Sequence, residues 1–578
     1  MCKVEKQTEI EKLPETEETD ENTDSDDDSD CSEDEDDSEE MTDTDEPHCP
    51  TLSPERIKEM DVNLMMFIIQ SYQPVGIVEQ EGFMRLRRAL NAGYVMPKRK
   101  DIVKIILPAM FAKCLEEQKI FVRENAETVC LTVDRWKSPN DEPLISIVAH
   151  FMTSDFQLKS ALLKVDYCER NTDNLKRVLT ETCTEWGISG KINCCVTNDM
   201  GQMTKDEWTK SAITSLGWDH INCVGYKLNT ALYNALRICS TIVVRVLNII
   251  AYFESSLKSR QKMIEYQAKE GVIDPLDLFY LEDMNWSSKY DMLERFVLLK
   301  EPVEAVLAEQ TDIRLAGITN EGWTELEQHL KLLKPFREAT REMVTDKYLA
   351  ASKVIPIVNG LKQELHKTPE CYYLVKHLIR SVDREMNVEF NSIENNPNLA
   401  MCTILDPRYK TSRFLDRNAA DAAKFNLVSS VEEMMEVGTC LTGPVKTHHG
   451  LKLAIDGDGV KLKLINQTNN RLALKEVESY LLEELTDEDK ALPLCKWWQN
   501  NKTKFPHVAK LYQARCNNIA TSIPPEYIFT EQGIDLYYRR NSLSLNKAAM
   551  IIFLNHNLKD EDYLRLMPES YHSVMDQL

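Results

Sequence analysis

Two short runs rich in β-branched residues, Thr128-Val-Cys-Leu-Thr-Val-Asp134 and Leu144-Ile-Ser-Ile-Val-Ala-His-Phe-Met152, decide the fold of this 578-residue chain. Their composition favours extended backbone, and the Pro/Asn turn between them predicts a β-hairpin. After the hairpin, further β-branched runs alternate with a segment of helical periodicity. The elements expected there are a strand over 161–167, a helix over 171–186, and strands over 192–197 and 220–226.

With a second helix between the last two strands, the expected order β-β-β-α-β-α-β resembles that of a ribonuclease H-like α/β core. On its N-terminal side, Ser53-Pro54-Glu55-Arg56 combines a capping serine, a proline and an acid, which together indicate the start of a helix. Between about residues 227 and 515 nearly every pattern is helical, with Pro or Gly between segments. The other helices that we expect lie over 81–90, 101–114 and 545–554.

The charge of the chain is concentrated at its N-terminus. Residues 1–50 contain 23 acids and three lysines, whereas residues 51–578 contain 71 acids and 66 bases. A segment so charged and so poor in apolar residues cannot bury enough surface to offset its chain entropy. We therefore expect a disordered acidic tail, which either binds basic proteins such as histones, inhibits a basic groove of the chain, or only keeps the chain soluble.

The composition also argues against several classes of protein. No stretch reaches the roughly 18 uninterrupted apolar residues of a membrane span, and we expect neither a secretory signal nor a membrane partner. Sixteen cysteines are scattered without any C-x-x-C pair. This pattern is typical of reduced thiols in the cytosol or nucleus, and it predicts no simple zinc finger.

Trp286-Ser-Ser-Lys-Tyr-Asp-Met-Leu-Glu-Arg295 is the most specific motif in the helical part of the chain. It resembles the R-W-N-S-T-Y-x-M-L block of the hAT superfamily of transposases, with Asn285 in place of the leading arginine. The resemblance covers about residues 60–557 and points to the domesticated BED-finger-type members, although an acidic tail stands where their finger is expected. Further matching blocks are Gln73–Phe83, Leu131–Ser138, Leu333–Phe336, Leu405–Lys410 and Trp497–Trp498.

The resemblance implies a ribonuclease H-like core interrupted by a large all-α insertion. After the tail (1–50) and an N-terminal helical region (51–125), the first part of the core is expected over 126–235. The helical insertion then covers 236–475. A hAT dimerisation region over 476–560 completes the core, and 561–578 forms a C-terminal tail.

A transposase of this class needs three carboxylates around two divalent metals, because hard cations require anionic oxygen ligands. By resemblance the first is Asp134 and the third is Glu526. At the second position the family shows T-D-N, whereas this chain shows Thr197-Asn198-Asp199. Asn198 carries no charge, and Asp199 should point to the opposite face if the strand continues. Asp199 could take the second catalytic position only if the strand ends at 198 and the chain turns.

The incomplete triad predicts a protein without cofactor, and magnesium only if the transposase alternative holds. A second departure agrees, since Cys223-Val-Gly-Tyr226 stands where the family has C-x-x-H. The structural alternative for Asp134 is a strand-end acid that caps a loop or pairs with a lysine. For Glu526 it is an acid near the positive end of a helix.

Apolar residues near the C-terminus are assigned by the resemblance to a homodimer seam. Their alternative is an ordinary core, and the two readings overlap because obligate interfaces resemble a bisected core. The residues assigned to dimerisation are Trp497, Trp498, Phe505, Phe529, Ile552, Phe553 and Leu554.

Lys98, Arg99 and Lys100 form a short basic block that predicts either a nuclear import signal or a phosphate contact. The alternative is a solvated helix start. With the resemblance, these features predict a nuclear, homodimeric, non-catalytic factor in transcription regulation. It would contact DNA or chromatin weakly or through other nuclear proteins. The alternative is an active metal-dependent DNA transposase.

Overall fold

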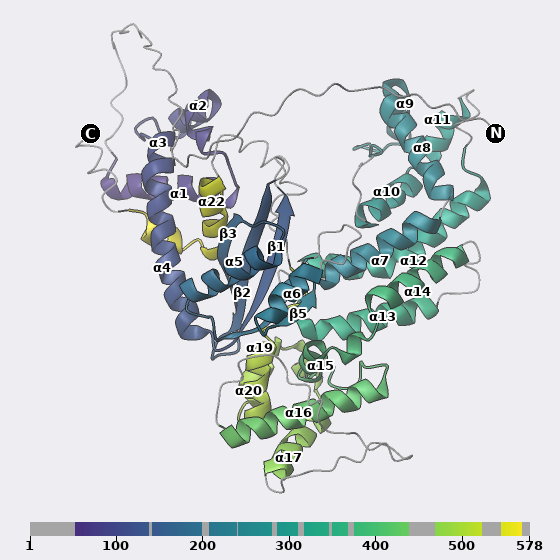
Figure 1. The fold of residues 1–578 in the computed structure, drawn as a ribbon. Coiled ribbons are helices and arrows are strands. Elements are labelled where there is room, and N and C mark those ends of the chain that lie inside the picture. Colours follow the sequence, from purple (N-terminus) through teal and green to yellow (C-terminus); the bar gives the residue numbers. More distant parts are fainter. Residues whose placement is uncertain are drawn as a thin grey trace, which may run out of the picture. The chain divides into compact units, whose positions relative to one another are not determined.

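A mixed five-stranded sheet forms the centre of the α/β part of the protein (Figure 1). The computed structural model describes residues 52–137, 142–198, 207–239, 241–279, 286–309, 317–345, 349–367, 375–437, 469–522 and 545–568. Its strand order is β3-β2-β1-β4-β5, with β1 antiparallel to β2, β2 antiparallel to β3, and β4 parallel to both β1 and β5. The elements of this part are β1 (Val129–Lys137), β2 (Pro143–Met152), β3 (Leu158–Tyr167), α5 (Thr172–Glu185), β4 (Ile192–Thr197), α6 (Glu207–Ser215) and β5 (Asp219–Asn222).

The hairpin, the third strand, the crossover helix and the fourth strand are confirmed close to their expected bounds. The fifth strand is shorter than expected, because it ends at Asn222 and helix α7 begins at Val224. The backbone N–H of Val224 donates to the carbonyl oxygen of Ala520 at 2.9 Å, from a segment about 300 residues later in the chain. The second half of the expected strand 220–226 is thus helical, and its first residue, Val224, is bonded to Ala520.

Helices precede the sheet, as the sequence predicts. Ser53 caps the first of them, since its side chain accepts a hydrogen bond from the N–H of Arg56. The helix expected over 101–114 extends to Asn125 and contains one π turn. The N-terminal elements are α1 (Pro54–Gln70), the 3-10 turn η1 (Val75–Glu79), α2 (Glu81–Leu90), α3 (Arg99–Asp101), the π turn η2 (Ile102–Ile106) and α4 (Leu107–Asn125).

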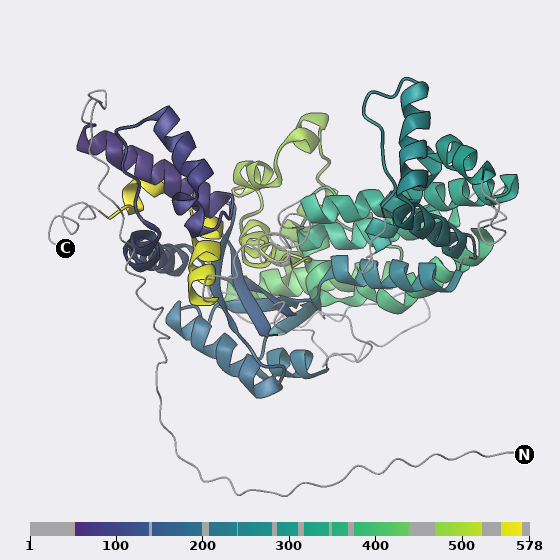
Figure 2. The same cartoon turned by 90° about the horizontal axis from the view of Figure 1, so that it is seen from above.

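Successive residues of the central strands lie in two different cores, as the period of two along a strand requires. Leu131 and Cys195 belong to the core formed with α1, α4, α5 and the late helix α22 (Leu545–Asn557). Figures 1 and 2 show α22, in yellow, beside α4 and β3. The side chain of Asn557 pairs with the edge of the sheet, accepting from Leu162 N–H and donating to Leu162 C=O, both at 3.0 Å.

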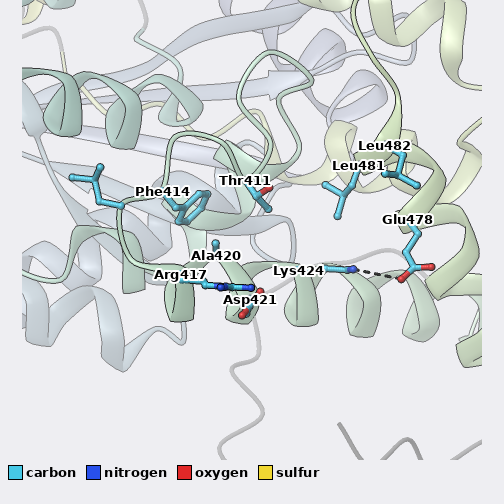
Figure 3. Close-up of a pocket in the computed structure, with 10 residues that line it drawn as sticks. Thr411, Phe414, Arg417, Ala420, Asp421, Lys424, Glu478, Leu481 and Leu482 are labelled. Atoms are coloured by element: carbon cyan, nitrogen blue, oxygen red, sulfur yellow. Dashed lines mark hydrogen bonds and ion pairs between the residues drawn. The ribbon is translucent and has the colours of Figure 1, made fainter. Parts of the chain in front are cut away.

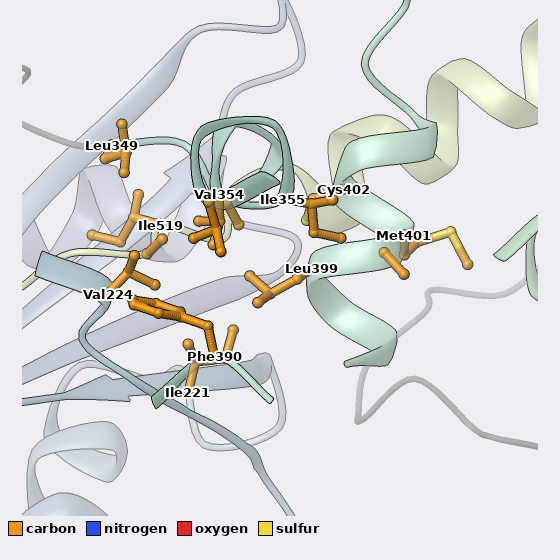
Figure 4. Packing of buried hydrophobic residues seen from close by; sticks show 14 of the residues in the cluster. Ile221, Val224, Leu349, Val354, Ile355, Phe390, Leu399, Met401, Cys402 and Ile519 are labelled. Carbon is orange, nitrogen blue, oxygen red and sulfur yellow. The ribbon is translucent and has the colours of Figure 1, made fainter. Parts of the chain in front are cut away.

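Cys130 and Cys194 belong to the other core, which the opposite face of the sheet forms with the helices that follow β5. Figure 4 shows Ile221 of the sheet beside Phe390, with Leu399 of a helix and Ile519 of the C-terminal segment in the same cluster. The elements of this helical part are α7 (Val224–Cys239), α13 (Val354–His366), α14 (Lys376–Glu389), α15 (Pro397–Ile404), α16 (Arg417–Val437), α17 (Asn469–Leu482), α18 (Asp487–Ala491), α19 (Leu494–Asn501) and α20 (Pro506–Arg515).

A third core lies entirely among helices. Phe296 stacks on Trp323 with ring centroids 5.3 Å apart, and Val246, Ile250 and Phe253 fill the space around them. No single helix within the described ranges is long and apolar enough to span a membrane; only the bent pair Val224–Leu236 and Thr241–Ser255 meets that test, by length and composition, when joined. The remaining elements are α8 (Thr241–Ser255), α9 (Leu257–Lys269), α10 (Trp286–Leu298), α11 (Lys300–Ala308), α12 (Asn320–Thr345), the 3-10 turns η4 (Ala351–Lys353) and η6 (Ile393–Asn395), and α23 (Asp562–Leu566).

Candidate functional site

The carboxyl ends of the parallel strands β1 and β4 lie next to one another at one edge of the sheet. Val133 is opposite Thr197 in the ladder, so Asp134 and Asn198 follow as neighbours. Both side chains are buried, with exposed fractions of 1% and 4%. The two residues that the sequence placed at the first and second catalytic positions are therefore brought together.

Asn198 is engaged by the backbone of the neighbouring strand. Its side-chain Oδ1 accepts a hydrogen bond from the N–H of Arg135 at 3.1 Å. The bond continues the β1–β4 pairing one step beyond the last residue of β4. An amide in this position satisfies a buried donor without adding charge, whereas a pair of divalent cations would require anionic ligands.

Arg135 anchors helix α6 to the end of β1. Its guanidinium group donates to Thr209 Oγ1 at 2.8 Å and lies over the Trp208 ring, with Cζ 4.2 Å from the centroid. The side chain is 8% exposed. Such a buried cation–π contact contributes about 2 kcal/mol, so this arginine holds α6 in place at the strand ends.

His220 closes the same edge from strand β5. Its Nε2 lies 2.8 Å from Thr197 Oγ1, on the residue before Asn198. Burial, reinforced by the positive charges of Lys210, Lys227 and Arg135, lowers the pKa of His220 to about 4. The imidazole is therefore neutral at physiological pH, and it serves as a hydrogen-bonding partner of the strand end.

The other proposed triad members, Asp199 and Glu526, lie outside the described residues. Within the described ranges, no three His, Cys, Asp or Glu side chains are grouped as a metal site requires. Of the three predicted carboxylates, Asp134 is the one that the structure describes, and the Asn198 side chain is bonded to the backbone N–H of Arg135.

The residues assigned to dimerisation lie inside the single chain. Trp497, Trp498 and Phe505 pack around Tyr480, with the two indole centroids 4.9 Å apart. Ile552, Phe553 and Leu554 of α22 lie in the other core, where the Phe553 ring meets Phe111 of α4 edge to face. None of the six is more than 3% exposed, and Phe529 is outside the described residues. Their role in a contact between two copies stays a prediction that this burial does not support.

The basic block lies at the start of α3. Lys98 and Lys100 are exposed and Arg99 is half-buried. The Asp101 carboxylate accepts a hydrogen bond from the backbone N–H of Lys98 at 3.3 Å, which closes the first turn. The arrangement is that of a solvated helix start, and its two lysines are accessible to a partner.

Two polar centres carry roles that the sequence did not reveal. Asp406, fully buried in the block matched at 405–410, binds Arg408 through two bonds of 2.9 and 2.6 Å and accepts from Ser352 Oγ at 2.9 Å. Asn517 donates to the carbonyl oxygen of Thr128 at 3.0 Å, at the start of β1. For Asp406 the signal in the sequence is the matched block Leu405–Lys410, whereas nothing in the residues around Asn517 indicates its role.

Models of three protein families match the chain. A ZBED1 RNase-like domain covers residues 132–214, a ZBED1 RNase-like helical domain covers 221–332, and a hAT family C-terminal dimerisation region covers 476–558. The first contains the strands that carry Asp134 and Asn198. The last contains α19, α20 and α22.

Several curated proteins are similar along most of the chain. Zinc finger BED domain-containing protein 4 of Homo sapiens is 22% identical over 84% of this chain and 42% of its own length. Zinc finger BED domain-containing protein DAYSLEEPER of Arabidopsis thaliana is 22% identical over 84% of this chain and 71% of its own length. Zinc finger BED domain-containing protein 6 of Homo sapiens is 19% identical over 86% of this chain and 55% of its own length. The chain thus spans about half of the first of them. The chain is thus similar to BED-type zinc finger proteins along most of its length, and parts of it match the RNase-like, RNase-like helical and hAT dimerisation models.

Proposed function

We propose that this chain is a domesticated, catalytically inactive hAT transposase-like protein, which acts in the nucleus as a homodimeric DNA- or chromatin-associated factor in transcription regulation. The observation that carries the proposal is Asn198. At the position where a second carboxylate would hold metal, its amide is bound by the N–H of Arg135. A neutral ligand already engaged in this way leaves the dication charge without compensation.

The regulatory part of the proposal rests on the relatives. Those reported above are named for BED zinc fingers, and one from Talaromyces stipitatus, 20% identical over 88% of this chain, is provisionally named a transcriptional regulator. Nuclear location is the ordinary setting for such proteins. The self-association is suggested by the match to the hAT dimerisation region.

The domain organisation proposed here is one ribonuclease H-like core that a helical insertion interrupts. Two contacts support it. Asn517, which follows the helical part in the sequence, donates to the carbonyl oxygen of Thr128 at the start of β1. Asn557 of α22 pairs with the edge strand β3. In this organisation the segment after residue 476 completes the core that begins near residue 126.

A nicking assay distinguishes the proposal from its alternative, an active transposase. The full chain is incubated with supercoiled DNA and Mg²⁺ or Mn²⁺, beside an Asp134→Asn variant with the same thermal melt. We expect no metal-dependent nicking by either protein. Nicking by the wild type that disappears in Asp134→Asn would establish the transposase chemistry and overturn the proposal.

DNA binding provides a second test. Because the sequence predicts no zinc finger to read base edges, we expect phosphate contacts to dominate, with an affinity that is weak, insensitive to sequence and steeply dependent on salt. Fluorescence anisotropy with two unrelated duplexes at about 50 and 200 mM salt measures both properties. Nanomolar binding to one duplex alone, maintained at the higher salt, would contradict this expectation.

The basic block is tested in cells. Lys98→Ala with Lys100→Ala removes two exposed charges from the start of α3, and the control, Lys258→Ala with Lys269→Ala, removes two exposed charges from α9. If the block is an import signal, only the first pair should shift a fluorescent fusion from the nucleus to the cytoplasm. An unchanged nuclear signal would leave import to another segment.

A further inference from the structure

A groove of about 700 Å³ lies between helix α16, the segment before it and the C-terminal end of helix α17 (Figure 3). Phe414 and Leu415 line it from the segment before α16, and Leu481 and Leu482 line it from α17. Lys424 and Glu478 form an ion pair of 3.4 Å between the two helices. The groove is thus lined by a mixture of apolar and charged side chains.

Two of the apolar side chains that line the groove are open to solvent. Leu482 is 80% exposed and Leu415 is 55% exposed. Single exposed leucines are ordinary on protein surfaces. Two that line the same groove, however, form a patch of the kind that marks an interaction site.

The region matched to hAT dimerisation begins in α17 and includes one wall of this groove. Apart from the buried aromatic and α22 side chains described above, the large apolar residues of that region that are exposed in the described structure are Leu482 and Leu492, at 80% and 38%. A contact between two copies needs apolar side chains that their own chain does not cover. Leu482 is therefore the strongest described candidate in the matched region.

The charges of the groove suit a second copy as its occupant. Arg417 and Lys424 supply two positive charges, while Asp421 and Glu478 supply two negative charges. In a two-fold symmetric dimer each surface meets a copy of itself, so a surface of one sign repels itself. The groove carries two charges of each sign, and Lys424 and Glu478 already neutralise one another within the chain, so two copies of the groove can approach without like-charge repulsion.

We propose that the α16–α17 groove is the face through which two copies of this chain associate about a two-fold axis, with Leu415 and Leu482 of each copy buried against the other. The inference rests on the self-association in the proposed function and gives it a surface. It moves the contact from the buried aromatic cluster to the exposed end of α17.

The test is the oligomeric state of the full chain, measured by light scattering and sedimentation over a range of concentrations. The variant is Leu415→Lys with Leu482→Lys, which places four charges in the contact. Its control is Leu298→Lys, because Leu298 is also the last residue of its helix and is 67% exposed. We expect the dissociation constant of the dimer to rise at least about 100-fold in the variant, as it does when hot-spot residues are replaced, and to be unchanged in the control.

The outcomes separate the groove from the dimer itself. A dimeric wild type with an equally dimeric Leu415→Lys, Leu482→Lys variant overturns the groove but leaves self-association intact. A wild type that is monomeric at all concentrations overturns both. Should the lysine pair lower the melting temperature, Leu415→Ala with Leu482→Ala adds no charge, and it should still weaken the dimer about 10-fold or more.

Discussion

At the scale of single residues, the edge beside Asp134 is organised by hydrogen bonds. Asn198 binds the backbone of Arg135, and His220 binds Thr197. In each pair a neutral group satisfies a partner that the sheet would otherwise leave buried and unpaired. The absence of charge is what makes both arrangements stable in a site with little water.

Replacing Asn198 by Asp should lower the free energy of unfolding by about 1–3 kcal/mol at pH 7, because a carboxylate would be desolvated there. Burial raises the folded-state pKa of such a carboxyl above its unfolded value. The loss in the free energy of unfolding is therefore complete at pH values above the folded-state pKa of the carboxyl group. It disappears as the pH falls to the pKa of that group in the unfolded chain. Urea unfolding at pH 7 and at low pH measures it.

The control for this prediction is Asn198→Ala. It removes the bond to the N–H of Arg135 without adding a charge, so its deficit, about 1 kcal/mol, should be the same at both pH values. An Asp variant that is equally destabilised at both pH values would show that its charge is not buried.

Histidine 220 should make the protein less stable in mild acid. Its pKa is about 4 in the folded chain, so between the ordinary value of 6.5 and about 4 the unfolded chain binds more protons. Stability is thus fully present above pH 6.5 and is lost as the pH falls, by about 2 kcal/mol at pH 5.

Comparison with His220→Gln isolates this contribution, because glutamine keeps an amide that can bond to Thr197 but does not titrate. Urea unfolding at pH 7.5 and pH 5 should show a loss in the wild type that exceeds the loss in the variant by about 2 kcal/mol. Equal losses would mean that His220 titrates normally.

At the scale of elements, helix α22 protects an edge of the sheet. Strand β3 stands at one end of the order β3-β2-β1-β4-β5, so within the described part of the chain its outward N–H and C=O groups have no neighbouring strand. The Asn557 amide pairs with both groups of Leu162, as another strand would. Covered edges resist pairing with other chains.

Asn557→Ala should lower the free energy of unfolding by about 2–3 kcal/mol, since it leaves a donor and an acceptor of Leu162 unpaired. It should also accelerate hydrogen exchange at the Leu162 amide. The matched control is Asn546→Ala, an exposed asparagine on the same helix, for which we expect a change within about 0.5 kcal/mol. Unchanged exchange at Leu162 would mean that another group covers the edge.

The strands could be predicted from sequence because their β-branched runs are short and bounded by turn residues, as at Thr128–Asp134. The start of α7 could not, because the bond from Val224 to Ala520 joins residues about 300 positions apart. The aromatic pair Trp497–Trp498 shows a different limit. Apolar side chains in a core and in an interface have the same composition, and only their burial at 3% and 0% separates the two.

At the scale of the whole molecule, the sheet depends on residues near the end of the chain. Thr128 Oγ1 donates to the carbonyl oxygen of Ala514 at 2.8 Å, and Asn193 donates to the same oxygen at 3.1 Å. Helix α22 covers the other face of the sheet. Neither face is complete without the C-terminal region.

Truncation after residue 490 should therefore give an insoluble product. It removes α19, α20 and α22, and it exposes apolar surface on both faces of the sheet, far above the few hundred Å² usual on soluble proteins. Soluble fraction after expression and light scattering of any recovered protein measure the effect. A soluble truncated chain with a cooperative melt would show that the first part of the core folds alone.

The bond from Thr128 to Ala514 can form only late in translation. The two residues are 386 positions apart, and a ribosome adds about 5–20 residues per second. The first strand therefore waits roughly 20–80 seconds, with a face uncovered, before its partner leaves the ribosomal exit tunnel. Throughout that interval the nascent chain presents a half-finished sheet, so chaperones that bind exposed strands have their best opportunity during translation, and slowing translation prolongs it.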